Sequence, residues 1–160
     1  MPDAKTTVNG AAAGAIAAFV WAVTEPLDKP IFRCRYSDVE FLGKGVTRGP
    51  KWRLIGFIMH LTNGALFGAI YANTKNRLPG PPVAKGLIAG MIEHLLSWPG
   101  TAIADRVHPA REELVSLSGN RAAFAQATWR HALFGATLGG VEGHLNSEEE
   151  PAEYPTDEQW

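Results

Sequence analysis

The chain has 160 residues, of which 46% are hydrophobic and 19% charged, and its formal net charge is −1. This length suits a single domain, and the near-neutral charge excludes the strongly basic footprint of a nucleic-acid-binding protein. Apolar residues gather in four blocks and most charges lie between them, which indicates membrane-spanning helices. We therefore expect an all-α fold, an integral membrane four-helix bundle over residues 1–146, with the lipid bilayer as its partner and no nucleic acid.

The first apolar block predicts a spanning helix over residues 6–25. The block carries no formal charge before Glu25-Pro26, where charge and proline together predict the end of the helix. A single lysine precedes the block and no convincing cleavage site follows it, so we expect an uncleaved span and not a secretory signal. Glu25 and Asp28 are interpreted as a solvated helix end, or alternatively as the mouth of a pathway leading to His60.

A long polar connection follows, from residue 27 to residue 53. Its glycines and prolines argue against a spanning element, and Ser37–Leu42 is expected to form one short amphipathic turn on the membrane surface. Cys34 is the only cysteine of the chain, so no intrachain disulfide can form and we expect a reduced thiol in a cytoplasmic loop. Seven residues of the connection are basic: Lys29, Arg33, Arg35, Lys44, Arg48, Lys51 and Arg53.

The second apolar block, residues 54–74, is long enough to cross a bilayer core, which needs about 20 predominantly apolar residues. Trp52 and Tyr71 lie near its two ends, where aromatic rings favour the membrane interface. A short proline-rich turn then predicts that the third span, residues 83–104, lies antiparallel to the second. We expect this third span to kink at Pro99.

A second polar connection leads to the fourth predicted span, residues 121–145. Ser118-Gly119-Asn120 is a helix start signal directly before it. This span carries Arg130 and His131 near its centre. Residues 147–160 are acidic and poor in apolar side chains, so we expect a disordered tail.

The four spans fall into two similar halves, which predicts two tandem helical-hairpin repeats related by an axis along the membrane normal. Residues 65–69 and 132–136 both read ALFGA, and residues 10–14 match residues 86–90. Each span also carries two glycines four residues apart, a spacing that lets helix backbones approach closely in lipid. We expect these glycines to pack the helices and to offer faces for assembly into a homo-oligomer. They are Gly10, Gly14, Gly64, Gly68, Gly86, Gly90, Gly135 and Gly139.

The basic residues predict the orientation in the membrane. Ten lie on the side of the two long connections and four lie on the opposite side. The positive-inside rule then places the long connections in the cytoplasm and both ends of the chain outside. These features predict a multi-pass protein of the bacterial cytoplasmic (inner) membrane.

Six polar side chains inside the predicted spans form a candidate intramembrane site. A lone charge near mid-membrane costs at least about 2.5–3.5 kcal/mol, so we predict that Glu93 and Arg130 face inward and pair. The repeat aligns Asn63 and Gly64 with Arg130 and His131, so the two halves differ where the site is expected. The six residues are His60, Asn63, Glu93, His94, Arg130 and His131.

These residues leave three functions open. The first is a non-catalytic membrane protein with a structural or membrane/pH-homeostasis role, in which the polar groups bond helices together. The second is a small proton- or ion-conducting protein, since intramembrane ionisable residues mark pathways and histidine titrates near neutral pH. The third is a haem- or metal-binding membrane protein with ligands such as His94 and His131, although no tight ligand spacing supports it. No nucleophile–base motif, phosphate loop or dinucleotide fingerprint is present, so we expect no catalytic residue and no cofactor.

Three stretches of the chain look like parts of one bacterial family. They are residues 10–26 (GAAAGAIAAFVWAVTEP), the span around His60 with residues 64–69 and Tyr71, and residues 85–90 running to His94 and Trp98-Pro99. On these stretches the chain resembles the YagU-like inner-membrane proteins. The resemblance implies an inner-membrane helical bundle without assigned catalysis and a link to acid tolerance, and it carries over no functional residue. The weakly basic N-terminus and the acidic C-terminal tail depart from that family.

Overall fold

The computed structural model describes residues 3–147, and within this part of the chain every regular element is a helix, as the all-α prediction expects. The elements are α1 (Ala4–Phe32), α2 (Asp38–Val46), α3 (Trp52–Thr74), η1 (Lys75–Arg77), α4 (Pro82–Ser97), η2 (Trp98–Gly100), α5 (Thr101–Val107) and α6 (Arg121–Ser147). The predicted acidic tail lies outside the described residues, apart from Ser147, which ends α6.

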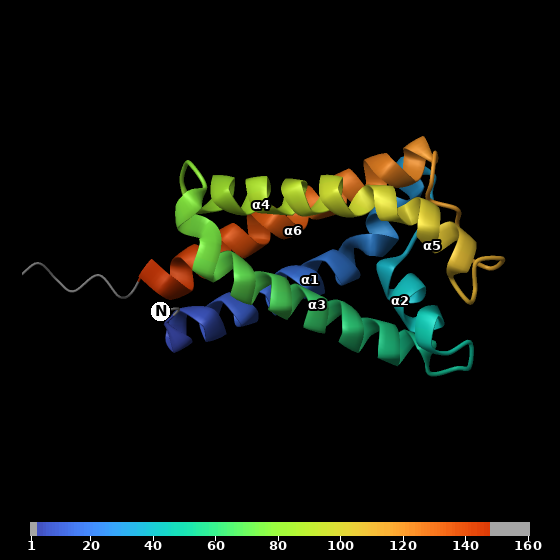
Figure 1. The fold of residues 1–160 in the computed structure, drawn as a ribbon, viewed down its shortest axis with the longest axis horizontal. Helices are drawn as coiled ribbons and strands as arrows, with labels where there is room; N and C mark the ends of the chain where they lie inside the picture. Colours follow the sequence, from blue (N-terminus) through green and yellow to red (C-terminus); the bar gives the residue numbers. More distant parts are fainter. Residues whose placement is uncertain (1–2, 148–160) are drawn as a thin grey trace, which may run out of the picture.

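The four long helices form an open bundle around α1 (Figure 1). α1 packs against α3 on one side and against α6 on the other, and α4 packs against α6. The two long connections, with α2 and α5, lie together at one end of the bundle. The start of α1, the turn between α3 and α4, and the end of α6 lie at the opposite end.

Among the described residues, two stretches are long and apolar enough to cross a membrane, Ala4–Phe32 and Trp52–Arg77. The predicted third span is shorter than expected, because α4 gives way to a 3-10 turn that contains Pro99. Proline has no amide hydrogen to donate, so the regular helix ends beside it. The predicted kink at Pro99 is present as this 3-10 turn. The expected span of residues 83–104 is thus divided among α4, η2 and α5.

α1 continues through Pro26 and Pro30, so the predicted helix end at Glu25 is wrong. A proline removes one backbone hydrogen bond, but contacts with other helices hold the last turns in place. The side chains that make these contacts are Glu25 and Asp28, which are only 5% and 2% exposed. Their interpretation as a solvated helix end is therefore also wrong. The helix ends at Arg33, whose backbone is left-handed (φ 50°, ψ 36°).

Glycines bring α1 and α3 into direct backbone contact. Gly10 and Gly14 of α1 face Gly64 and Gly68 of α3, and a Cβ atom on any of the four would crowd a carbonyl oxygen of the opposite helix. Without side chains between them the two backbones touch directly, which favours dispersion contacts along their length.

α4 and α6 pack in the same way. Gly86 faces Gly135, Gly90 faces the carbonyl of His131, and Gly139 faces the carbonyl of Pro82. Both hairpins thus use four-spaced glycines on facing helices, although the tandem repeat itself stays a prediction. Because the eight predicted packing glycines are covered inside the chain, none of them is open for contact with a second copy.

The local signals of the two connections set where α2 and α6 begin. Asn120 Oδ1 accepts a hydrogen bond from the amide of Ala123 at 3.1 Å, so the predicted start signal before α6 is confirmed. Ser37 caps α2 by accepting a hydrogen bond from the amide of Glu40 at 3.3 Å. α2 is longer than the single turn expected there, and it packs on α3 through Gly43.

The second connection is tied to α2 and folded upon itself. His108 Nε2 donates to the carbonyl of Phe41 at 3.0 Å. The carboxylate of Asp105 accepts hydrogen bonds from the amides of Leu117 at 3.0 Å and Ser118 at 2.7 Å. Burial acts to raise the pKa of Asp105, but these bonds favour its ionised form and hold the pKa below its ordinary value. Both connections therefore form an ordered cap over one end of the bundle.

We expect Gly14→Ala to destabilise the fold by about 1–3 kcal/mol, because the new methyl group would force α1 away from α3. Gly140→Ala is the matched control, since a Cβ atom there would lie 3.8 Å from Val83, an ordinary contact. Alanine favours helix over glycine by about 1 kcal/mol, so the control should be neutral or stabilising. Thermal unfolding of the two purified variants measures the difference; equal effects would refute tight packing at Gly14.

Candidate functional site

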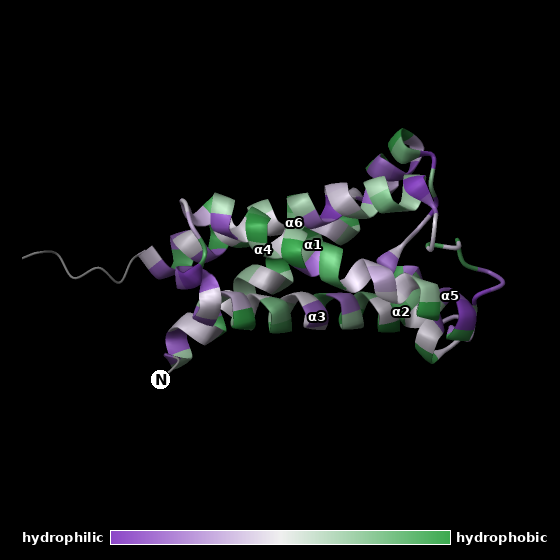
Figure 2. Cartoon of the chain, turned by 45° about the horizontal axis from the view of Figure 1, so that its top comes forward, coloured by the Kyte–Doolittle hydropathy of each residue, from purple (hydrophilic) through white to green (hydrophobic). Residues whose placement is uncertain are grey.

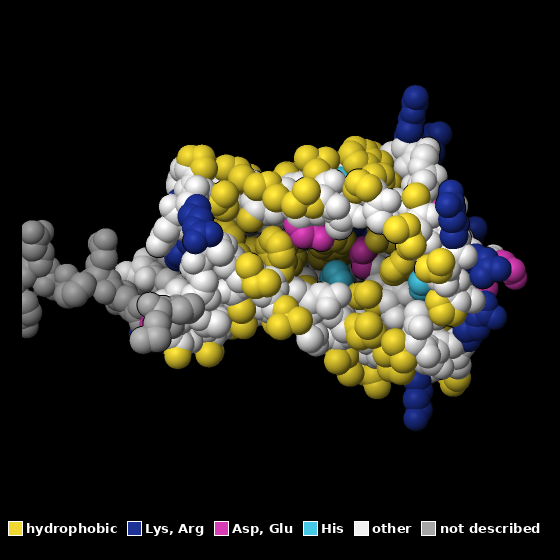
Figure 3. Space-filling model, in the orientation of Figure 1, with side chains coloured by type: hydrophobic (Ala, Val, Ile, Leu, Met, Phe, Trp, Pro, Cys, Tyr) yellow, Lys and Arg dark blue, Asp and Glu magenta, His cyan; other side chains and the backbone are white. Residues whose placement is uncertain are grey.

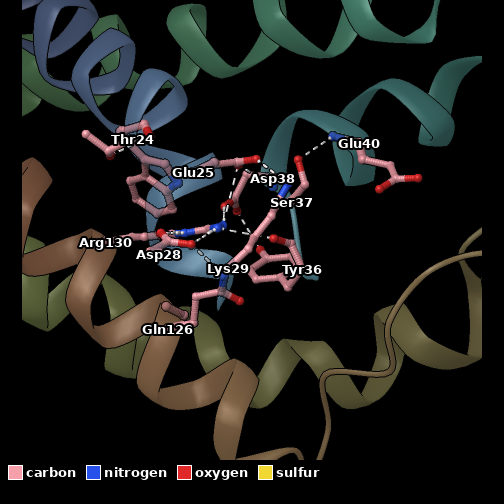
Figure 4. Close-up of polar contacts among 12 residues, drawn as sticks. Thr24, Glu25, Asp28, Lys29, Tyr36, Ser37, Asp38, Glu40, Gln126 and Arg130 are labelled. Atoms are coloured by element: carbon pink, nitrogen blue, oxygen red, sulfur yellow. Dashed lines mark hydrogen bonds and ion pairs between the residues drawn. The ribbon is translucent and has the colours of Figure 1, made fainter. Parts of the chain in front are cut away.

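The polar interior is built around Arg130 of α6, whose side chain is fully buried. Its Nε and Nη2 donate to the two carboxylate oxygens of Asp28, on α1, at 2.5 and 2.7 Å. This bidentate pairing is the strongest geometry available to a guanidinium. Its Nη1 also lies 3.4 Å from Glu25 and 3.3 Å from Asp38, so three carboxylates surround one cation (Figure 4).

The segment between α1 and α2 completes this cluster. The carbonyl of Tyr36 accepts from Arg130 Nη2 at 3.2 Å, so all five N–H donors of the guanidinium meet acceptors. The phenol of Tyr36 donates to Asp38 Oδ1 at 2.5 Å. Burial, reinforced by the negative charge of Asp38, raises the pKa of Tyr36 well above its ordinary value, so the phenol stays a donor.

Gln126 links the cluster to α6 a second time. Its amide nitrogen donates to Asp28 Oδ1 at 2.6 Å and to the carbonyl of Cys34 at 3.1 Å. Gln126 and Arg130 are four residues apart, so both side chains leave α6 on the face that meets α1. Cys34 is a free thiol, as one cysteine requires, but it is buried.

The predicted pairing of Glu93 with Arg130 is wrong. Arg130 points toward α1, whereas Glu93 Oε2 lies 2.7 Å from Nε2 of the neighbouring residue, His131. Successive residues of a helix point about 100° apart, so Arg130 and His131 serve different partners. The prediction that Arg130 faces inward is confirmed, but the sequence did not determine which acid it meets.

Glu93 and His131 share one proton. His131 Nδ1 lies 2.7 Å from the carbonyl of Ala127, which can only accept, so Nδ1 carries a proton. His131 Nε2 then either carries a second proton and donates to the Glu93 carboxylate, or accepts the proton of a neutral Glu93 carboxyl. In both states a proton lies between two heavy atoms 2.7 Å apart.

His94 stacks behind this pair. It is fully buried, and its ring centroid lies 4.6 Å from that of His131. The Thr128 hydroxyl donates a hydrogen bond to the carbonyl of Phe124. Its oxygen therefore accepts from His94 Nε2, at 2.9 Å. The other nitrogen of His94, Nδ1, has no hydrogen-bond partner among residues 3–147.

This arrangement opposes the hypothesis that His94 and His131 hold a haem iron. Both nitrogens of His131 already face oxygen atoms, and the two rings stack on each other instead of pointing at one central ion. Within residues 3–147, no group of three or more His, Cys, Asp and Glu side chains is placed to hold a metal ion.

A cavity of about 550 Å³ lies between α3 and α4, with side chains of α1 and α6 behind it. Figure 3 shows this hollow on one face of the molecule, with acidic and histidine side chains inside and hydrophobic side chains around it. Four of the six predicted site residues line the cavity: His60, Asn63, Glu93 and His131. The other two do not, since His94 stacks behind His131, and Arg130 binds Asp38, itself a lining residue.

His60 and Trp21 meet on the α1 side of the cavity. His60 Nε2 donates to the carbonyl of Ala18 at 3.0 Å. The ring of Trp21 packs edge-on against His60 and against His131, with centroids 5.3 and 4.7 Å apart. Trp21 is only 6% exposed, and its Nε1–H has no hydrogen-bond partner in the described part of the chain.

A second ion pair lies at the opposite end of the bundle from the connections. Lys75 Nζ lies 2.6 Å from Oε1 of Glu142, whose side chain is fully buried. Asn146 donates to the same carboxylate oxygen at 2.6 Å. Between this pair and the Arg130 cluster, the bundle is filled by apolar side chains such as Phe134 and Leu138.

Sequence reasoning missed four residues of the site: Trp21, Tyr36, Asp38 and Gln126. The four-residue spacing of Gln126 and Arg130 could have indicated one polar face on α6, and the three-residue spacing of Glu25 and Asp28 a matching acidic face on α1. Proline at position 26 hid the second signal, because it suggested that the helix had already ended. Nothing local marked Trp21 as a buried donor.

No family model, curated protein or solved structure compared with the chain matches it, so the resemblance to YagU-like proteins stays a prediction.

We expect Arg130→Gln and Asp28→Asn each to cost about 3–5 kcal/mol, because either change leaves a buried charge without its partner. The double variant should lose less than the sum, since it removes both charges of the bidentate pair and leaves only Glu25 and Asp38 without Arg130. Unfolding of the four purified proteins in detergent gives the coupling free energy.

The matched control cycle pairs Arg130→Gln with Glu93→Gln. These side chains bind different partners, so we expect a much smaller coupling free energy. Strong coupling of Arg130 to Glu93, together with additive losses at Asp28, would contradict the contacts described above.

Proposed function

We propose that the chain is a multi-pass protein of the cytoplasmic (inner) membrane, a bundle of four spanning helices built from two hairpin units. In this proposal its role is structural or in membrane and pH homeostasis, with Glu93 and His131 as the proton-binding group, and not catalysis. One observation carries the proposal: large apolar side chains lie on the outside of the bundle, while charged and small side chains fill the inside.

The outer surface of the long helices is apolar. Leu27 and Ile31 on α1 are 68% and 74% exposed, and Leu96 on α4 is 77% exposed. Figure 2 shows hydrophobic residues along the long helices and hydrophilic residues concentrated at their ends and in the connections. On the face drawn in Figure 3, Lys and Arg side chains project at the two ends of the molecule and the middle is hydrophobic.

The interior has the opposite character. Arg130, Glu142 and Gln126 are completely buried, and glycines and alanines make the closest helix contacts. A water-soluble protein buries its large apolar side chains and rarely exposes a contiguous apolar surface. A membrane protein does the reverse, because lipid gives no hydrophobic drive between helices and small or polar residues must hold them together. The distribution therefore favours a bilayer around the bundle.

The membrane location is tested by fractionating cells that express the full chain. We expect the protein to stay with membranes after an alkaline wash and to leave them only in detergent, since four helices present apolar surfaces to lipid. Recovery in the aqueous fraction without detergent would reject the proposal.

Single cysteines test the orientation in the same cells. Asn76→Cys, in the turn between α3 and α4, should react with a membrane-impermeant maleimide added outside, whereas Arg111→Cys, in the second connection, should react only after lysis. The native Cys34 is buried and should add little background. The reverse pattern would overturn the orientation.

Proton conduction is a second candidate function, and the shared proton of Glu93 and His131 beside a cavity favours it. A conducting path also needs polar groups through the full thickness of the bilayer. Phe134 and Leu138 fill the bundle between this pair and the Lys75–Glu142 pair, which favours a closed structure.

We expect proteoliposomes with the purified protein to show no more proton flux than empty vesicles, because the apolar layer interrupts the polar groups. A pH-sensitive dye inside the vesicles measures the flux under an imposed gradient. The opposite result would be a proton flux that is lost in Glu93→Gln but kept in Glu112→Gln, in the exposed connection. That result would make proton conduction, and not homeostasis, the proposed role.

A further inference from the structure

The cavity described above continues as a groove along α3 and α4. A second hollow of about 570 Å³ is lined by both helices toward the turn that joins them. Phe67, Ile70, Glu93 and Ser97 line both spaces, so the two are contiguous. Away from Glu93 the groove is lined mainly by apolar side chains such as Ile92 and Leu96, with Thr74 and Arg77 at the end near the turn. The whole space therefore has a polar head region and an apolar extension.

The head region is unusually rich in aromatic rings. Five aromatic side chains and two imidazoles line it: Trp21, Tyr36, Phe41, Phe67, Phe134, His60 and His131. Aromatic walls favour a flat ring, which can stack on one side chain and meet the edges of others. A branched or globular head would leave these surfaces uncovered.

The head region also offers a donor and an acceptor that nothing in the protein uses. Trp21 Nε1–H is fully buried behind the cavity surface and has no partner within residues 3–147, so a ligand reaches it only after the indole ring shifts; a buried donor without a partner is costly. The hydrogen on His60 Nε2 is given to the Ala18 carbonyl, so Nδ1 of the neutral ring is left as an acceptor. A ligand that carries both a carbonyl and a hydroxyl group would match this donor and this acceptor. So would a ligand whose carbonyl groups become hydroxyl groups on reduction.

The charges of the head region disfavour an anionic ligand. The lining contains no Lys or Arg, so a phosphate or carboxylate head would meet the carboxylates of Asp38 and Glu93 and no side chain with a permanent positive charge. The two carboxylates that line it have partners, Glu93 with His131 and Asp38 with Arg130, and Arg130 is shared with Asp28 and Glu25, so the cluster repels an anion. The groove opens on the apolar face of the bundle, which is the route by which a membrane-dissolved molecule would arrive.

We propose that this groove binds an isoprenoid quinone or quinol, with its ring among the aromatic side chains beside Trp21 and His60 and its tail along α3 and α4. This inference deepens the proposed function, because it rests on a bundle that lies in the membrane and names the ligand of the same site. One ring carbonyl accepts from Trp21 Nε1–H once the indole ring has turned toward the groove, and one hydroxyl of the reduced form donates to His60 Nδ1.

The test is isothermal titration calorimetry of decylubiquinone into the purified full chain in detergent, with protein-free micelles subtracted. We expect saturable binding of one molecule per chain. Decyl phosphate, with the same tail and an anionic head, should bind at least about tenfold more weakly, since the head region lacks a cation. Equal binding of both ligands, or heats no larger than those of empty micelles, would overturn the proposal.

Two variants with matched controls locate the ligand. Trp21→Phe keeps a ring but removes the free donor, and should weaken binding about fivefold, whereas Trp129→Phe on the exposed face of α6 should not. Ile70→Trp fills the groove and should weaken binding at least about tenfold, whereas Ile58→Trp, equally exposed on α3 but outside the groove, should not. Unchanged affinity in both Trp21→Phe and Ile70→Trp would place the ligand elsewhere and refute the site.

The two proposals fail in different ways. A chain that inserts into membranes but does not bind decylubiquinone keeps the membrane location and refutes the quinone site. Suppose instead that the chain binds decylubiquinone with the expected variant pattern but is recovered from cells without detergent. That result supports the quinone site and refutes the membrane location.

Discussion

The buried contact between Arg130 and Asp28 is the interaction on which the rest of the structure depends. A guanidinium removed from water costs several kcal/mol unless every donor is satisfied, and here five acceptors come from α1, the following segment and α2. These hydrogen bonds hold the last turns of α1, beyond Pro26, against α6. They also hold the segment that follows the reversal of the chain at Arg33. One charge thus connects parts of the chain that are about 100 residues apart in sequence.

The cavity follows from this constraint together with the glycine contacts. α1 meets α3 at backbone distance through glycines, and it meets α6 through the charged cluster at one end. α4 packs along α6 through its own glycines. α3 and α4 therefore lie on opposite sides of α1 and α6, with an opening between them. The same packing that stabilises the two hairpins therefore leaves a space with Glu93 and His131 at its centre.

Features that depend on neighbouring residues could be predicted from the sequence, and those that depend on distant partners could not. Apolar blocks, the start signal at Asn120 and the break at Pro99 are local, and the helices follow them. The inward positions of Glu93 and Arg130 could be predicted because a charge avoids lipid. Their pairing could not, since it depends on how α6 is rotated and on the turns of α1 beyond Pro26, which tertiary contacts stabilise against the local preference of proline.

The central claim is that the apolar outer faces of the bundle meet lipid while its charged side chains face inward. Nitroxide labels at Ile58 on α3 and Leu95 on α4, both on the outer surface, test it directly in proteoliposomes, with a label at Glu112 in the second connection as the water-exposed reference. Electron paramagnetic resonance relaxation measures collision with oxygen, which concentrates in lipid, and with a water-soluble nickel chelate. The account requires high oxygen and low nickel accessibility at positions 58 and 95 and the reverse at position 112; nickel accessibility at 58 and 95 equal to that at 112 would contradict it.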